Sequence, residues 1–138
     1  MKSLFFTICL VAGLAYNAQS QKMAAQLQSK KWYANGSVGK GTITLRAAET
    51  AKMANQWQAV FSNTGRMSNC STLANDVVDM SGMTAKAGTF YCDSSYVYSV
   101  KNDMVSIMML DQFYYYKMKA LPNSEGIELS PASKDDFK

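Results

Sequence analysis

The sequence predicts an all-β fold of about eight short antiparallel strands, and three observations support this. Apolar and polar residues alternate with a period of two in several segments, which is typical of strands with one buried face. Turn dipeptides such as Asn35-Gly36 and Asn102-Asp103 separate these segments at short spacing. No segment has the length of a helix that connects parallel strands. The pattern therefore favours an antiparallel meander, closed as a barrel or folded as a sandwich.

The first half of the chain contains a short helical lead-in and four predicted strands. Met23 and Leu27 lie four residues apart, which places both on one face of a helix over 21–28. Ile43 and Leu45 alternate with polar residues, and Trp57, Ala59 and Phe61 do the same further on. The predicted strands cover 31–34, 42–46, 56–62 and 66–70, with a stop at Asn35-Gly36 and a turn at Asn63-Thr64-Gly65.

The second half begins with an irregular segment, 71–89, which contains Ser81-Gly82 and Ala87-Gly88. The residues after it are rich in tyrosine and valine, which favour strands. We expect strands over 90–101, 104–110, 113–121 and 127–129, with a hairpin turn at Asn102-Asp103 and another over 122–126. Contact between the first and last strands removes exposed edges from such a sheet.

Residues 1–20 have the features of a cleavable signal peptide. Lys2 provides a positive start, twelve uncharged and mostly apolar residues follow over 4–15, and small residues at Ala18 and Ser20 suit cleavage before Gln21. The apolar run is shorter than the roughly 20 residues of a membrane span. The residues before Cys9 do not fit a lipoprotein signal. We therefore expect an exported protein, periplasmic or secreted, without a transmembrane segment.

Removal of residues 1–20 from the 138 leaves 118 residues, which is enough for one domain. We expect a barrel domain over 21–130 and a flexible polar tail over 131–138. Without Lys2 the chain has 13 basic and 10 acidic residues, a net charge of +3. The basic residues are scattered rather than gathered in a stripe, so nucleic acid is not an expected partner.

Two cysteines, Cys70 and Cys92, remain after export. An even number of cysteines in an oxidising compartment predicts a disulfide bond. Their separation of 22 residues corresponds to about 3 kcal/mol of stabilisation in the chain-entropy model. A metal-binding pair and a catalytic thiol are the alternatives, and neither has a histidine to support it.

The chain contains no histidine, which excludes the Ser-His-Asp and Cys-His arrangements of hydrolases and every imidazole metal ligand. Acidic pairs such as Asp76 with Asp79 and Glu125 with Glu128 are more typical of turns and solvated faces than of a glycosidase. Ten methionines admit a copper(I) site, although methionine also fills cores. We expect no catalysis, no metal and no cofactor.

Several segments resemble bacterial lipocalin-like domains. Leu27 followed by Lys30-Lys31-Trp32-Tyr33 is similar to their opening, in which a tryptophan closes the barrel floor. The other similar segments are Trp57 to Phe61 with Asn63-Thr64-Gly65, Tyr98 to Val105, and Tyr116 to Leu121 with Ile127-Glu128-Leu129. The resemblance implies an eight-stranded up-and-down barrel that binds a small hydrophobic or amphipathic molecule, with Trp32 at its floor.

A weaker resemblance connects Ala87-Gly88-Thr89-Phe90-Tyr91 to a loop of periplasmic lysozyme inhibitors, which are also small disulfide-bonded barrels. It implies the alternative function, a protein-interaction module whose barrel is filled and whose loops bind a protein partner.

Alternating aromatic residues are the candidates for ligand binding. Tyr114, Tyr116 and Met118 share one face of their strand, and Tyr96 and Tyr98 share a face two strands earlier. If these faces point inward, they line the interior with apolar walls and a few hydroxyl groups, which suits an amphipathic ligand. If the barrel is filled, the same side chains are its core. The predicted ligand-binding residues are Trp57, Phe61, Tyr96, Tyr98, Tyr114, Tyr116 and Met118.

Overall fold

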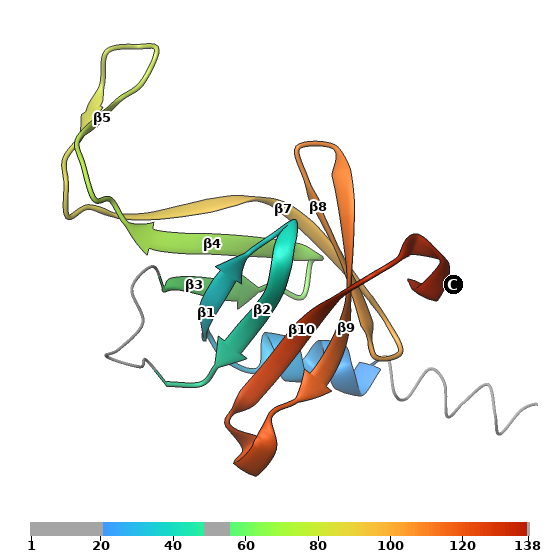
Figure 1. Cartoon of the computed structure of the whole chain (residues 1–138). Coiled ribbons are helices and arrows are strands. Elements are labelled where there is room, and N and C mark those ends of the chain that lie inside the picture. Colours follow the sequence, from blue (N-terminus) through green and yellow to red (C-terminus); the bar gives the residue numbers. More distant parts are fainter. Residues whose placement is uncertain (1–20, 49–55, 138) are drawn as a thin grey trace, which may run out of the picture.

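The computed structural model describes residues 21–48 and 56–137. Eight strands of this part form a closed antiparallel barrel, and a short helix over 21–28 precedes the first, which confirms the predicted fold class (Figure 1). The barrel strands are β1 Trp32–Ser37, β2 Lys40–Arg46, β3 Trp57–Phe61, β4 Arg66–Thr72, β7 Phe90–Lys101, β8 Met104–Met109, β9 Gln112–Ala120 and β10 Gly126–Ala132. The predicted signal peptide, 1–20, lies outside the described residues.

The barrel is closed by pairing of the last strand with the second. β10 pairs with β2, from Gly126 opposite Arg46 to Leu129 opposite Ile43. β1 lies between β2 and β3 and is antiparallel to both, so these two consecutive strands flank β1 instead of pairing with each other. In a strict meander the last strand would pair with the first. Either pairing leaves every barrel strand with two neighbours and removes the exposed edges.

Alternate side chains of the strands fill most of the barrel interior. Leu45, Ala59, Met67, Val105 and Ile107 have no exposed surface. They come from four strands, β2, β3, β4 and β8, so the core depends on closure of the barrel. Burial of a valine, leucine, isoleucine or methionine side chain is worth about 1.5–3 kcal/mol.

One end of the barrel is covered by the helix over 21–28. Trp32, the predicted floor residue, is buried there, and its indole N–H donates a hydrogen bond to the carbonyl of Leu27 at 2.9 Å. The amide of Gln28 donates to the hydroxyl of Tyr98 at 2.8 Å, and that hydroxyl donates to the carbonyl of Ser62 at 2.6 Å. These hydrogen bonds join the helix to β1 and β7, and β7 to the end of β3, and so fix the covered end of the barrel.

The prediction that Asn35-Gly36 ends the first strand is wrong. β1 continues to Ser37, and its pairing with β2 shifts register between Asn35 and Ser37, which marks a β-bulge. Gly36 has a φ of 105°, a conformation that glycine adopts without strain. The chain turns two residues later, at Val38-Gly39. The bulge therefore moves the hairpin turn further along the chain.

Two predicted boundaries change in the second half of the chain. The segment 71–89, predicted as irregular, contains the end of β4 and a hairpin of β5, Val77–Val78, and β6, Thr84–Ala85, which projects from the barrel (Figure 1). β10 extends to Ala132, two residues past the predicted end of the barrel domain, and a 3-10 helix follows over Lys134–Phe137. The Phe137 ring lies 5.5 Å from that of Tyr115.

The predicted disulfide between Cys70 and Cys92 is present. The two cysteines lie directly opposite each other on β4 and β7, so the antiparallel register brings them together. The bond joins these strands two residues before β4 ends and the projecting hairpin begins.

Candidate functional site

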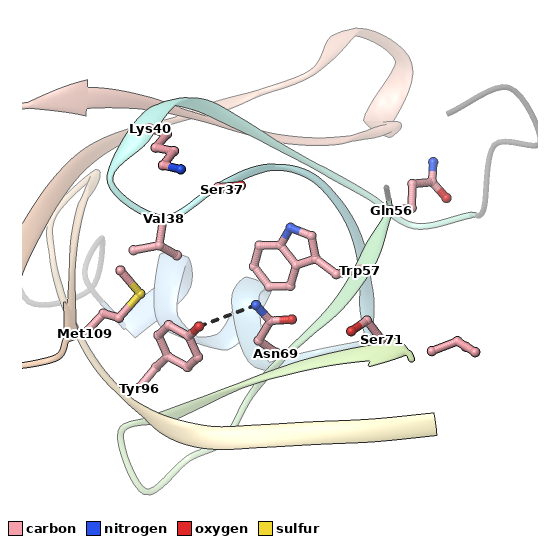
Figure 2. A pocket seen from close by; sticks show the side chains of 10 residues that line it. Ser37, Val38, Lys40, Gln56, Trp57, Asn69, Ser71, Tyr96 and Met109 are labelled. Atoms are coloured by element: carbon pink, nitrogen blue, oxygen red, sulfur yellow. Dashed lines mark hydrogen bonds between the residues drawn. The ribbon is translucent and has the colours of Figure 1, made fainter. Parts of the chain in front are cut away.

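A cavity of about 700 Å³ opens at the end of the barrel opposite the helix. Figure 2 shows Val38, Trp57, Asn69 and Tyr96 pointing toward one another around it. They come from the β1–β2 turn, β3, β4 and β7. The full lining is Ser37, Val38, Lys40, Gln56, Trp57, Asn69, Ser71, Thr72, Tyr96 and Met109.

Trp57 forms one aromatic wall of the cavity, and a hydrogen bond to the backbone fixes its orientation. It begins β3, and its indole N–H donates a hydrogen bond to the carbonyl of Gly36 at 2.7 Å. That carbonyl belongs to the bulge of β1, so the bulge both extends the β1–β2 hairpin and orients the indole. Trp57 is largely buried and contributes an apolar ring to the cavity wall, with its N–H bonded to the backbone.

Tyr96 and Asn69 form the opposite wall. Tyr96 lies on β7, and Met67 lies opposite it on β4. Asn69, two residues after Met67 on the same face of β4, donates from its amide to the Tyr96 hydroxyl at 3.5 Å (Figure 2). This bond is long, so both groups keep capacity for a ligand. Ser71 continues the polar face of β4 toward the opening.

The charge of the lining is positive. Lys40, at the start of β2, is charged. The other described lining residues carry no charge, so none of them is acidic. Asp93, which lies opposite Asn69, accepts a hydrogen bond from the backbone of Ser95 at 2.9 Å. The cavity therefore offers a cation, hydroxyls, amides and two aromatic rings, and it suits an anionic or polar group attached to an apolar body.

The seven predicted ligand-binding residues separate into three groups. Trp57 and Tyr96 line the cavity. Phe61 and Tyr98 lie at the opposite end of the barrel, where their rings meet edge to face at 5.0 Å. The third group, on β9, belongs to the packed interior or its margin and comprises Tyr114, Tyr116 and Met118. Side chains on one face of a strand thus reach different depths of the barrel.

Tyr116 supports the cavity without lining it. The side chain is 2% exposed, and its hydroxyl accepts a hydrogen bond from the N–H of Gly39 at 2.7 Å. Burial raises the pKa of the Tyr116 phenol, and the Gly39 N–H opposes that rise. A side chain on Gly39 would meet the ring of Tyr114, so the turn lies closely against β9. The two tyrosines hold the turn that carries Val38 and Lys40.

Sequence reasoning missed most of the polar lining. Val38 and Lys40 were not identified because the expected turn at Asn35-Gly36 left them between the predicted strands 31–34 and 42–46. Asn69 and Ser71 alternate with Cys70, and this period-two pattern was a usable signal for one polar inward face near the end of β4.

Comparisons with family models, with curated proteins and with solved structures find no match. No helix within the described residues is long and apolar enough to cross a membrane.

Proposed function

We propose that this chain is an exported, non-catalytic, lipocalin-like protein that binds a small amphipathic molecule at the open end of its barrel. The observation that carries the proposal is the cavity of about 700 Å³ between Trp57 and Tyr96, with Lys40 at its edge. Small-molecule sites are typically concave, of about 300–1,000 Å³, and combine apolar walls with a few polar groups.

The position of the cavity narrows the class of ligand. The interior beneath it is packed, with Met67, Val105 and Ile107 fully buried, so a long chain cannot pass down the barrel axis. A compact molecule with a ring fits better, because the ring can stack between Trp57 and Tyr96 while polar groups face Asn69 and Ser71. Lys40 favours a carboxylate, sulfonate or phosphate on that molecule.

The aromatic part of this proposal is tested with an anilinonaphthalene sulfonate dye, which is anionic and carries rings. We expect the wild-type protein to bind it with saturable fluorescence enhancement and energy transfer from tryptophan. Trp57→Phe should weaken binding because it removes the larger stacking surface. Trp32→Phe, which changes the tryptophan at the helix-covered end, is the matched control and should keep the affinity. Equal affinity for both variants, with circular dichroism showing both folded, would disprove the site.

The charge of the ligand is tested at Lys40, which is exposed and forms no ion pair within the described residues. Lys40→Gln should lower the affinity for the sulfonate dye about fivefold, which corresponds to about 1 kcal/mol for one exposed charge contact. It should leave the affinity for an uncharged phenylnaphthylamine unchanged. Lys101→Gln, at the far end of β7, is the control and should alter neither.

Export is the remaining part of the proposal, and the disulfide between Cys70 and Cys92 supports it because such bonds persist in oxidising compartments. N-terminal sequencing of the protein recovered outside the cytoplasm should begin at or near Gln21. Retention of Met1 on that material would exclude cleavage.

A further inference from the structure

The hairpin tip, defined here as residues 37–41, joins β1 to β2 beside the cavity. On one side, the continuous register of β1 with β2 ends at Thr44, before the bulge at Gly36. On the other side, the pairing of β2 with β10 ends at Ile43, opposite Leu129. Both ladders thus stop at adjacent residues of β2, and the continuous sheet ends just before the hairpin tip begins.

Beyond Leu129, β10 follows β9 and leaves β2. Residues 130–132 lie opposite residues of β9, and in the described part of the chain none of them pairs with β2. Pro131 has no N–H to donate to a second neighbouring strand, which suits it to the end of a ladder. A seam cavity of about 170 Å³ lies here, with Gly39 and Gly41 on one side and Pro131 on the other.

The hairpin tip is the wall between the seam cavity and the main cavity of about 700 Å³. Gly39 and Gly41 line the seam cavity, whereas Val38 and Lys40 line the main one. Val38 is 8% exposed and belongs to the hydrophobic core. Figure 2 shows its side chain pointing into the main cavity, on the side where Trp57 lies. Displacement of the hairpin tip would therefore join the two cavities and uncover Trp57.

A side-chain hydrogen bond, rather than a ladder, holds the hairpin tip against β9. The N–H of Gly39 donates to the Tyr116 hydroxyl at 2.7 Å. Gly39 also lies so close to β9 that a Cβ there would come within 2.7 Å of the Tyr114 ring. Displacement breaks this bond and exposes Val38, while the ladders below Ile43 stay intact. Local opening of this kind costs much less free energy than global unfolding.

Glycines at the two ends of the hairpin tip provide the hinges. Gly36 has a φ of 105° and Gly41 a φ of 76°, and glycine moves between such conformations without a steric penalty. No atom lies within 4 Å of a Cβ built on Gly41, so the backbone has room to move there. The carbonyl of Gly36 accepts the indole N–H of Trp57, which anchors the other hinge to β3.

We infer that the hairpin tip is a flap that opens on Gly36 and Gly41, and that the bond between Tyr116 and Gly39 latches it shut. Opening joins the seam cavity to the main cavity and gives a ring-bearing ligand access to Trp57. Closing returns Lys40 to its place over the anionic group of the ligand. The control of ligand entry rests on the proposed function, whereas the motion of the flap does not.

Acrylamide quenching of Trp57 fluorescence tests the motion without a ligand. In a Trp32→Phe background Trp57 is the sole tryptophan. Tyr116→Phe keeps the ring and removes the latch, so it should raise the open population about fivefold, the effect of losing one ordinary hydrogen bond. The quenching constant of Trp57 should rise with that population.

Tyr98→Phe is the matched control. It also removes one hydroxyl from a buried tyrosine, but that hydroxyl donates to the carbonyl of Ser62 at the covered end of the barrel, at 2.6 Å. The quenching constant of Trp57 should therefore stay at the value of the Trp32→Phe background. Circular dichroism shows that both variants are folded.

Stopped-flow binding of the sulfonate dye tests the control of entry. If the ligand enters and leaves through the open flap, Tyr116→Phe should raise both the association and the dissociation rate constants. The dissociation rate constant should rise more, because the closed complex also loses stability. If Tyr116 only shapes a static site, the dissociation rate constant alone should rise. Tyr98→Phe should change neither rate constant.

Equal quenching of Trp57 in Tyr116→Phe and Tyr98→Phe would overturn the flap. An association rate constant that Tyr116→Phe leaves unchanged would overturn its control of ligand entry. Failure of the proposed function gives a different result: the dye does not bind the wild type, yet Tyr116→Phe still raises the quenching of Trp57. In that case the flap stands and the ligand class is wrong.

Discussion

The hydroxyl of Tyr116 accepts a hydrogen bond at 2.7 Å from the backbone N–H of Gly39, which lies 77 residues earlier in the chain. The bond connects the middle of β9 to the turn between β1 and β2, and that turn carries Val38 and Lys40 of the cavity. A residue predicted to bind the ligand is therefore one that holds the binding turn in place.

The Tyr116 hydroxyl is expected to affect the turn more than the core. Tyr116→Phe keeps the ring and removes the bond to Gly39, so it should cost about 1 kcal/mol of unfolding free energy. It should also weaken binding of the sulfonate dye, since the turn with Lys40 is less restrained. Tyr116→Ala removes a packed ring and should cost roughly 3–5 kcal/mol. Denaturant unfolding of the ligand-free proteins measures both. An alanine variant within about 1 kcal/mol of the wild type would mean that the interior around Tyr116 is hollow.

Stability should fall at alkaline pH, in part through Tyr116. Burial holds the pKa of its phenol above the ordinary value of 10.0 in the folded state. Above pH 10 the unfolded chain loses this proton while the folded chain keeps it, so the unfolded state gains stability as the pH rises. The contribution is fully present below pH 10 and is lost as the pH rises through the folded-state pKa. Unfolding free energies measured across this range should decline less steeply for Tyr116→Phe than for the wild type.

The bulge at Gly36 should be sensitive to a single methyl group. Gly36 has a φ of 105°, and a Cβ there would lie 2.5 Å from the carbonyl oxygen of Thr42. Gly36→Ala should therefore cost at least about 1–3 kcal/mol and weaken dye binding, because the Gly36 carbonyl orients Trp57. Gly41→Ala is the control: φ is 76° there, but no atom lies within 4 Å of the added carbon. Thermal unfolding should give a clearly lower Tm for Gly36→Ala than for Gly41→Ala. Equal Tm values would exclude the close approach of the Gly36 backbone to the Thr42 carbonyl oxygen.

The Cys70–Cys92 bond should stabilise the barrel where β4 and β7 lead into the hairpin of β5 and β6. The paired substitutions Cys70→Ser and Cys92→Ser should lower the unfolding free energy by about 3 kcal/mol for a loop of 22 residues. Thiol titration of the denatured, unreduced wild type should find no free thiol. Two thiols per chain would contradict the bond, and an unchanged midpoint of unfolding in the double variant would contradict its contribution.

Local patterns accounted for most of the secondary structure. Ile43 with Leu45, and Trp57 with Phe61, repeat every second residue, and this period exists in the chain before any tertiary contact forms. The cysteine count likewise predicted the disulfide, because the predicted removal of residues 1–20 leaves only one possible pairing. The hairpin of β5 and β6 was not predicted, since its strands contain two residues each and show no period.

The sequence by itself determined the strand-rich composition, the faces of the long strands and the pairing of the cysteines, because each depends on neighbouring residues or on a count. Only the tertiary structure decided that β10 pairs with β2, how deep each inward residue lies, and which end of the barrel is hollow. Tyr96 and Tyr98 illustrate the difference. They share one face of β7, yet the first lines the cavity and the second is bonded to Gln28 and Ser62 at the opposite end. Depth along a barrel depends on the register of all eight strands and on the helix that covers one end, and no local pattern contains that information.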